Sequence, residues 1–172
     1  MALNDVPLTT LSPVVTDPVP VEPVAAEPEP VVERSASLAE KVAELRGSDA
    51  GSRELECLAA GVYFESKSES LPGQLAVGQV IANRANSKGR FPSSYCGVLF
   101  QRGQFSFVRG GRWPGVNKSS AQWKNAVGIA RIVDQDLHQS SVGRALFFHA
   151  RRVSPGWRLT RVASVGNHVF YR

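Results

Sequence analysis

Two glutamates, Glu65 and Glu69, are the residues of this sequence whose type and spacing best suit acid–base chemistry. Glu65 follows Leu58 by seven positions and Val62 by three. On a helix its carboxyl group would therefore share a face with inward-packing apolar residues. Burial and the negative carboxyl end of a helix both disfavour the ionised form and raise the pKa. A carboxylic acid that stays protonated near neutral pH can protonate a glycosidic oxygen. The alternative interpretation is an exposed glutamate at a helix end.

Glu69 would lie one turn beyond Glu65 if the helix continued, although Pro72 makes that continuation uncertain. A second negative charge there would raise the pKa of Glu65 further. Two carboxylates one helical turn apart approach a substrate from the same side. We therefore predict that Glu69 modulates Glu65 and does not act as a nucleophile. From residue 57 to the end the other acids are only Asp134 and Asp136, which are expected on a solvated helix face.

Aromatic, amide and imidazole side chains are plentiful around these acids and suit a sugar ligand. Aromatic faces stack on sugar C–H surfaces, and amides and imidazoles bond hydroxyl and N-acetyl groups. For each aromatic residue the alternative is packing in the core. The predicted substrate-binding residues are Glu69, Gln104, Phe105, Ser106, His149, Trp157, His168 and Tyr171.

Other kinds of site find little support. The three histidines, His138, His149 and His168, show no metal-ligand spacing with cysteine or aspartate, so we predict no metal site and no cofactor. The chain has neither a G-x-S-x-G nucleophile elbow nor a phosphate-binding glycine loop. Cys57 and Cys96 are the only cysteines. They are compatible with one disulfide in an oxidising compartment or with two buried free thiols.

Charge and proline divide the chain into two unlike parts. Residues 1–34 contain six acids, one base and seven of the eleven prolines, whereas residues 35–172 contain nineteen bases and nine acids. We predict a disordered acidic tail or linker over 1–34 and one basic domain over 35–172. No export signal is visible. The sequence also has no run of 18 apolar residues, which a membrane-spanning helix would need.

Local patterns predict a helix-rich α+β domain with a small sheet near its end. A capping box at Ser37 and Glu40 opens a helix over 38–46, with Gly47 as its glycine cap. Further elements are predicted as helices after Ser52, from 72 to 84 and from 120 to 138, a strand or buried turn at 98–100, a long ligand-binding loop over 101–118, a strand at 145–148, and a strand or hairpin over 162–171.

Six ordered segments resemble the cell wall hydrolase family typified by spore cortex-lytic enzymes. The resemblance extends over about residues 54–172, and the segments are 58–69, 73–84, 91–101, 103–107, 145–150 and 166–171. It implies a lysozyme-like or lytic-transglycosylase-like fold that cleaves peptidoglycan between N-acetylmuramic acid and N-acetylglucosamine. The catalytic glutamate of the family falls on Glu65. Relatives from Gram-negative envelopes often carry a second cysteine pair where this chain has Arg102, Gly103 and 108–109.

If Glu69 turns away from Glu65, one acid is left and the muramic 6-hydroxyl can attack internally, so we favour a lytic transglycosylase. We expect a monomer of the periplasm or cell envelope, with glycan strands as its partner. Hydrolysis with a second carboxylate remains open, because the two carboxyl groups of glycosidases lie about 5 Å apart in retaining and farther apart in inverting enzymes. Two other classes also remain open. One is an N-acetylmuramoyl-L-alanine amidase, although that chemistry usually uses zinc. The other is a non-catalytic basic module that binds peptidoglycan; a nucleic-acid partner is not expected, because no recognition motif is present.

Overall fold

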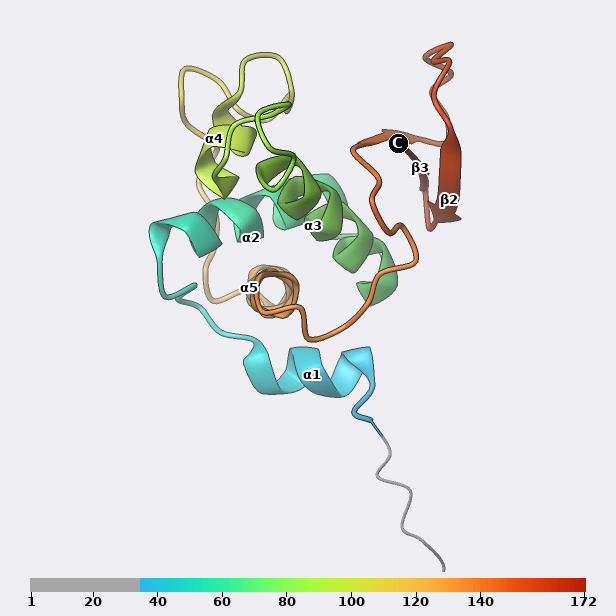
Figure 1. The fold of residues 1–172 in the computed structure, drawn as a ribbon. Helices are drawn as coiled ribbons and strands as arrows, with labels where there is room; N and C mark the ends of the chain where they lie inside the picture. The colour runs from blue at the N-terminus through green and yellow to red at the C-terminus, as the bar shows by residue number, and fades with distance from the viewer. Residues whose placement is uncertain (1–34) are drawn as a thin grey trace, which may run out of the picture. The chain divides into compact units, whose positions relative to one another are not determined.

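Residues 35–172 are the part of the chain that the computed structural model describes, and in them five helices precede a three-stranded sheet (Figure 1). The predictions made for 1–34 lie outside the described residues. Among the described helices, none is long and apolar enough to cross a membrane. The elements are α1 (Leu38–Leu45), α2 (Arg53–Ser66), α3 (Leu71–Ala85), α4 (Tyr95–Phe100), α5 (Ala121–Asp134), β1 (Phe147–Ala150), β2 (Arg161–Val165) and β3 (His168–Tyr171).

Serine side chains determine where most of these helices begin. A serine at the N-cap accepts a hydrogen bond from a backbone N–H of the first turn, which otherwise has no partner. At α1 this bond belongs to the predicted capping box, in which Glu40 also accepts from the Ser37 backbone. Helix α3 begins instead with proline in its first turn. The other serines that cap a helix in this way are Ser52, Ser94 and Ser120.

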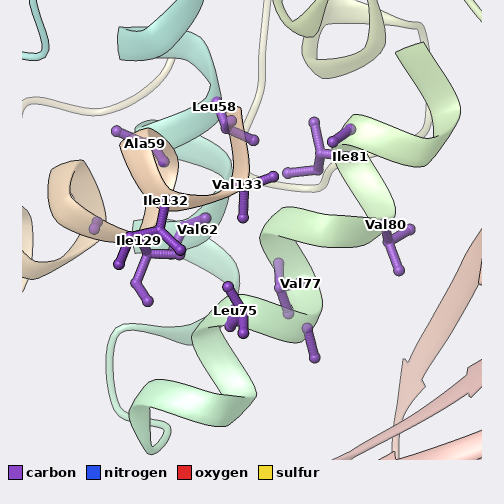
Figure 2. Packing of buried hydrophobic residues seen from close by; sticks show 14 of the residues in the cluster. Leu58, Ala59, Val62, Leu75, Val77, Val80, Ile81, Ile129, Ile132 and Val133 are labelled. Atoms are coloured by element: carbon purple, nitrogen blue, oxygen red, sulfur yellow. The ribbon is translucent and has the colours of Figure 1, made fainter. Parts of the chain in front are cut away.

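The core lies where α2, α3 and α5 pack against one another (Figure 2). Leu58 and Val62 from α2, Val77 and Ile81 from α3, and Ile129 from α5 are all fully buried or nearly so. A methyl group added at Gly61 of α2 would collide with Cδ1 of Ile81. The absence of a side chain at Gly61 therefore lets α2 and α3 approach closely, and the last turn of α2 is held against α3.

The predicted C-terminal hairpin is confirmed, and the sheet has the order β1-β3-β2 with antiparallel neighbours. The central strand β3 is the most buried, and its Phe170 pairs with Phe148 of β1. Helix α3 is tied to the segment that enters β1. The Arg84 side chain donates to the Leu146 carbonyl at 2.7 Å, and the Asn83 side chain donates to the Ala145 carbonyl at 2.9 Å.

Helix boundaries account for most differences from the sequence predictions. Gly47 does not cap α1, because the helix ends through Arg46 in an extended conformation. The predicted strand or turn at 98–100 is part of α4. The Glu54 carboxylate accepts hydrogen bonds from two backbone N–H groups of the first turn of α4, at 2.7 and 3.3 Å. The first strand runs from 147 to 150, two residues later than predicted.

Helix α5 ends at Asp134, four residues before the predicted end. Asp136 adopts a left-handed conformation with φ of 52°. The backbone N–H groups of Leu137 and Asp136 donate to the Ile132 and Val133 carbonyls at 2.9 and 3.2 Å. This is the Schellman pattern, with an aspartate at the position that usually holds glycine. Since no glycine marks this end, the apolar periodicity predicted a longer helix.

A disulfide joins Cys57 of α2 to Cys96 of α4, with an S–S distance of 2.06 Å. Within residues 35–172 there is no free cysteine. The bridge ties the helix that carries Glu65 to the segment that leads into the 101–118 loop.

Candidate active site

Glu65 stands in the last turn of α2 and lines a hollow of about 380 Å³. The hollow is built from three regions far apart in the sequence: the ends of α2 and α3, the loop after α4, and the sheet. Five of the predicted site residues line it together with Glu65, namely Gln104, Phe105, Ser106, His149 and His168. The remaining lining residues are Phe64, Arg84, Phe107, Phe148, Ala150 and Arg152.

Burial raises the pKa of Glu65 above its usual value of 4.5, and the positive charge of Arg84 opposes that rise. Removing a carboxylate from water penalises its charged form, so the protonated acid persists to higher pH. The direction agrees with the sequence prediction. The part assigned to Glu69 was wrong, because Glu69 is not among the groups that shift the pKa of Glu65.

Arg84 is the main residue of the site that the sequence analysis missed. It lies near the end of α3 with only 5% of its surface exposed. Its guanidinium donates to the Leu146 carbonyl and, at 3.3 Å, to Oε1 of Gln104. Aromatic rings of Phe91, Phe105 and Phe147 lie within 5.0–5.8 Å of it. Burial lowers the pKa of Arg84 to about 10, so it remains a cation at neutral pH. The available signal was that Arg84 is the single charged residue of α3.

Glu69 lies in the turn between α2 and α3, since α2 ends at Ser66. Its side chain is 8% exposed. Oε2 accepts from the backbone N–H of Asn167 at 3.2 Å, and Oε1 lies 3.7 Å from Nδ1 of His168. A methyl group added at Gly166 would collide with this carboxylate. Glu69 therefore holds the β2–β3 turn against the α2–α3 turn.

Two histidines form part of the sheet side of the hollow. Nδ1 of His149 donates to the Ala150 carbonyl at 2.8 Å, and Nε2 accepts from the Tyr171 hydroxyl at 2.9 Å. A carbonyl oxygen can only accept, so Nδ1 carries a proton. Burial lowers the pKa of His168, against a smaller opposite effect of the Glu69 charge. Over residues 35–172, no three His, Cys, Asp or Glu side chains gather as a metal ion requires.

Two of the predicted substrate-binding residues stand behind the hollow and do not line it. Tyr171 supports His149 through its hydroxyl and a stacked ring, 5.3 Å between centroids. Trp157 is 42% exposed and makes edge contacts with His149 and Tyr171. The sequence predicts both as sugar-binding aromatics, and in the structure both contact the His149 ring.

Two further hollows adjoin the first one and extend it into a groove. One, of about 380 Å³, shares Glu65, Ala150, Arg152 and His168 with it. The other, of about 420 Å³, shares Ser106 and Phe107. We call the three together the long groove. Glu65 stands where two of them meet, which is where a chain-like substrate laid along the groove would pass the acid.

Comparison with known proteins agrees with this arrangement. Residues 68–171 match the sequence model of the Cell Wall Hydrolase family. The chain is 31% identical over 121 residues to a spore cortex-lytic enzyme of Oceanobacillus iheyensis, covering 68% of this chain and 41% of the relative. It is 32% identical over 120 residues to one of Bacillus cereus, covering 68% and 43%. The chain thus spans less than half the length of these relatives.

Solved structures give the same result for the fold. The catalytic domain of the germination-specific lytic transglycosylase SleB from Bacillus anthracis superposes with a TM-score of 0.56 at 28% identity, covering 70% of this chain and 96% of that one. The catalytic domain of Bacillus cereus SleB superposes with a TM-score of 0.54, also at 28% identity, covering 69% and 89%. The helical domain with its short sheet thus has the fold of the SleB catalytic domain. The chain belongs to the Cell Wall Hydrolase family.

Proposed function

We propose that this protein degrades peptidoglycan as a lytic transglycosylase, with Glu65 as its general acid. The bond cleaved is that between N-acetylmuramic acid and N-acetylglucosamine. The observation that carries the proposal is a carboxyl group whose pKa is raised by burial, at the junction of two hollows in a long groove. The family and the SleB-like fold support the same substrate class.

In the proposed reaction Glu65 first gives its proton to the glycosidic oxygen as the bond to muramic C1 breaks. The leaving N-acetylglucosamine then departs as an alcohol. The positive charge of Arg84 favours the carboxylate that Glu65 has become. The muramic 6-hydroxyl oxygen then attacks C1, and its proton returns to Glu65. The product is a 1,6-anhydro sugar, and the enzyme ends in its starting protonation state.

The position of Glu69 supports this route over a displacement through a second carboxylate. A nucleophile must reach C1 from the face opposite the acid. One oxygen of Glu69 accepts from the Asn167 backbone, and the side chain is almost fully buried. These contacts engage the Glu69 carboxylate with the β2–β3 turn, and they leave it poorly placed to attack C1. Besides Glu65 and Glu69, no Asp or Glu lines the described part of the long groove.

The proposed substrate also indicates where the protein acts. Peptidoglycan lies outside the cytoplasmic membrane, so we propose that the protein acts as a monomer in the periplasm or cell envelope. The Cys57–Cys96 disulfide supports an oxidising compartment.

The test replaces Glu65 by glutamine, which keeps the shape of the side chain and removes the proton donor. Loss of a general acid costs typically about 10²–10⁴-fold in rate. The measurement is release of soluble fragments from purified sacculi, with mass spectrometry of their muramic ends. We expect 1,6-anhydro ends from the wild type and almost none from Glu65→Gln.

Two results would overturn the proposal. If Glu65→Gln kept more than about a tenth of the wild-type rate, Glu65 would not be the acid. If the wild type released only reducing muramic acid, water would be the acceptor and the enzyme a hydrolase. Circular dichroism of the variant shows whether its fold is intact.

A further inference from the structure

A tight turn in the loop after α4 places two arginines directly opposite each other. Gly110 and Gly111 have φ of 57° and 69°, which glycine adopts without strain. Arg109 and Arg112 flank them and exchange both backbone hydrogen bonds, at 2.9 and 3.1 Å. This is a two-residue hairpin turn, in which the two flanking side chains leave the same face. The turn thus holds two guanidinium groups side by side.

Such a pair is unfavourable without a partner, because like charges that face each other across two strands repel. Both arginines are exposed. Across residues 35–172 no Asp or Glu forms a salt bridge with either one. A carboxylate placed between them would remove the repulsion, since each guanidinium can donate two parallel hydrogen bonds to it.

The arginine pair opens onto the long groove. It lines the hollow of about 420 Å³ together with Trp113 and Pro114, and that hollow continues through Ser106 and Phe107 toward Glu65. Two neighbouring side chains hold the Trp113 ring in place. It stacks on Phe100 at 5.6 Å between centroids, and the Arg53 guanidinium lies 4.6 Å from its centroid. The site is therefore a basic, aromatic-walled end of the groove.

We propose that Arg109 and Arg112 bind a carboxylate of the peptide that muramic acid carries in peptidoglycan. This inference rests on the proposed function. In a strand that carries its peptides the sugar backbone has no free carboxylate, because each muramic lactyl group is bound in the amide link to the peptide. A peptide attached to the strand in the groove brings its carboxylates along the same surface. The arginine pair then selects strands that still carry peptides.

The test compares soluble glycan oligomers of equal length that carry either their peptides or only a simple amide on each lactyl group, so that the peptide-free oligomers hold no carboxylate. The double variant Arg109→Gln/Arg112→Gln removes both charges from an exposed turn and leaves the backbone bonds possible. We expect KM for peptide-bearing oligomers to rise about 10–100-fold, as for the loss of about 1.4–2.7 kcal/mol of charge-assisted bonding. The value of kcat should stay near that of the wild type, and KM for peptide-free oligomers should not change.

The matched control removes two positive charges from another hollow. Lys88 and Arg144 line a separate cavity that shares no residue with the long groove. We expect Lys88→Gln/Arg144→Gln to leave the preference for peptide-bearing oligomers unchanged. An equal loss in this control, or an equal loss on peptide-free strands, would overturn the proposal, because either result means unspecific attraction or a sugar contact.

A binding measurement separates this inference from the proposed reaction. Glu65→Gln is titrated calorimetrically with both kinds of oligomer, so no turnover is required. We expect tighter binding of the peptide-bearing oligomer and loss of that difference when the two arginine substitutions are added. Equal affinity for both oligomers refutes the arginine site even if cleavage occurs. A clear difference in affinity between the two oligomers supports the arginine site even if the products of the wild type show another reaction.

Discussion

Burial and the charge of Arg84 act on Glu65 in opposite directions, and their balance sets the pH range of the proposed acid. Burial raises the pKa, whereas the nearby cation lowers it. Activity that needs the protonated form falls as pH rises through the pKa. Arg84 therefore lowers the upper pH limit of activity. It also favours the Glu65 carboxylate that forms when the proton leaves.

Removing the charge of Arg84 should extend the active range to higher pH. In Arg84→Gln the pKa of Glu65 rises further, so the basic limb of the pH–rate profile moves upward. The rate at the optimum should drop about 10–100-fold, because about 1.4–2.7 kcal/mol of stabilisation of the carboxylate is lost. The full profile on sacculi measures both effects.

Two controls make this result specific. Arg84→Lys keeps the charge and should leave the basic limb near its wild-type position. Glu69→Gln should not move the limb, because Glu69 does not shift the pKa of Glu65. A limb that moves downward in Glu69→Gln would restore the coupling that the sequence suggested.

Sequence patterns located the proposed acid, Glu65, but not Arg84, the arginine that acts on it. Glu65 was found because it continues the apolar face of α2, a relation within one helix. Arg84 acts on it from α3, and its partners come from the β1 approach and the 104–107 loop. Contacts of this kind depend on how helices and strands pack against one another. The apolar periodicity within one helix contains no information about that packing.

At the scale of elements, the β2–β3 turn is positioned by a carboxylate from the helical part. Gly166 has φ of 54°, and an added methyl group would overlap the Glu69 carboxylate. Since Asn167 and His168 follow this glycine and line the groove, the contact sets where one wall of the groove lies.

We expect Gly166→Ala to destabilise the fold and reduce activity. The left-handed backbone alone costs about 1–2 kcal/mol for alanine. The collision with Glu69 adds about 1–3 kcal/mol and displaces the turn. Chemical denaturation measures the free energy of unfolding, and sacculus lysis measures activity.

Gly143 provides the matched control for this variant. Its φ is 48°, but an added methyl group would meet nothing within 4 Å. Gly143→Ala should therefore show only the backbone cost and keep its activity. If both variants lost the same stability and the same activity, the Glu69 contact would have no role.

The elements themselves were largely predictable, for local reasons. Serine N-caps mark the starts of α1, α2 and α5, and apolar spacing marks their inner faces. The errors arose where no local sequence signal marks the boundary of the element. Glu54 caps the start of α4 across 41 residues, and the left-handed Asp136 ends α5 where no glycine announces it.

At the scale of the whole molecule, residues 35–172 contain their own core and all groove residues. We predict that a chain starting at Ser35 unfolds cooperatively and is as active as the full chain at high salt. At low salt it should be equally or more active, because the acidic segment 1–34 then no longer competes with the anionic wall. Lysis assays at two ionic strengths and thermal unfolding provide the measurement. A truncated chain that loses its cooperative transition would contradict it.

The folded chain is more stable with the Cys57–Cys96 disulfide formed than with the two cysteines reduced. The disulfide closes a loop of 39 residues that contains both Glu65 and Arg84. In the chain-entropy view, such a closure is worth about 4 kcal/mol. That is a large share of the roughly 5–15 kcal/mol that holds an ordinary domain folded. Copies kept where thiols stay reduced would be unfolded more often and degraded sooner by proteases. The lifetime of the protein is thereby linked to the compartment that it reaches.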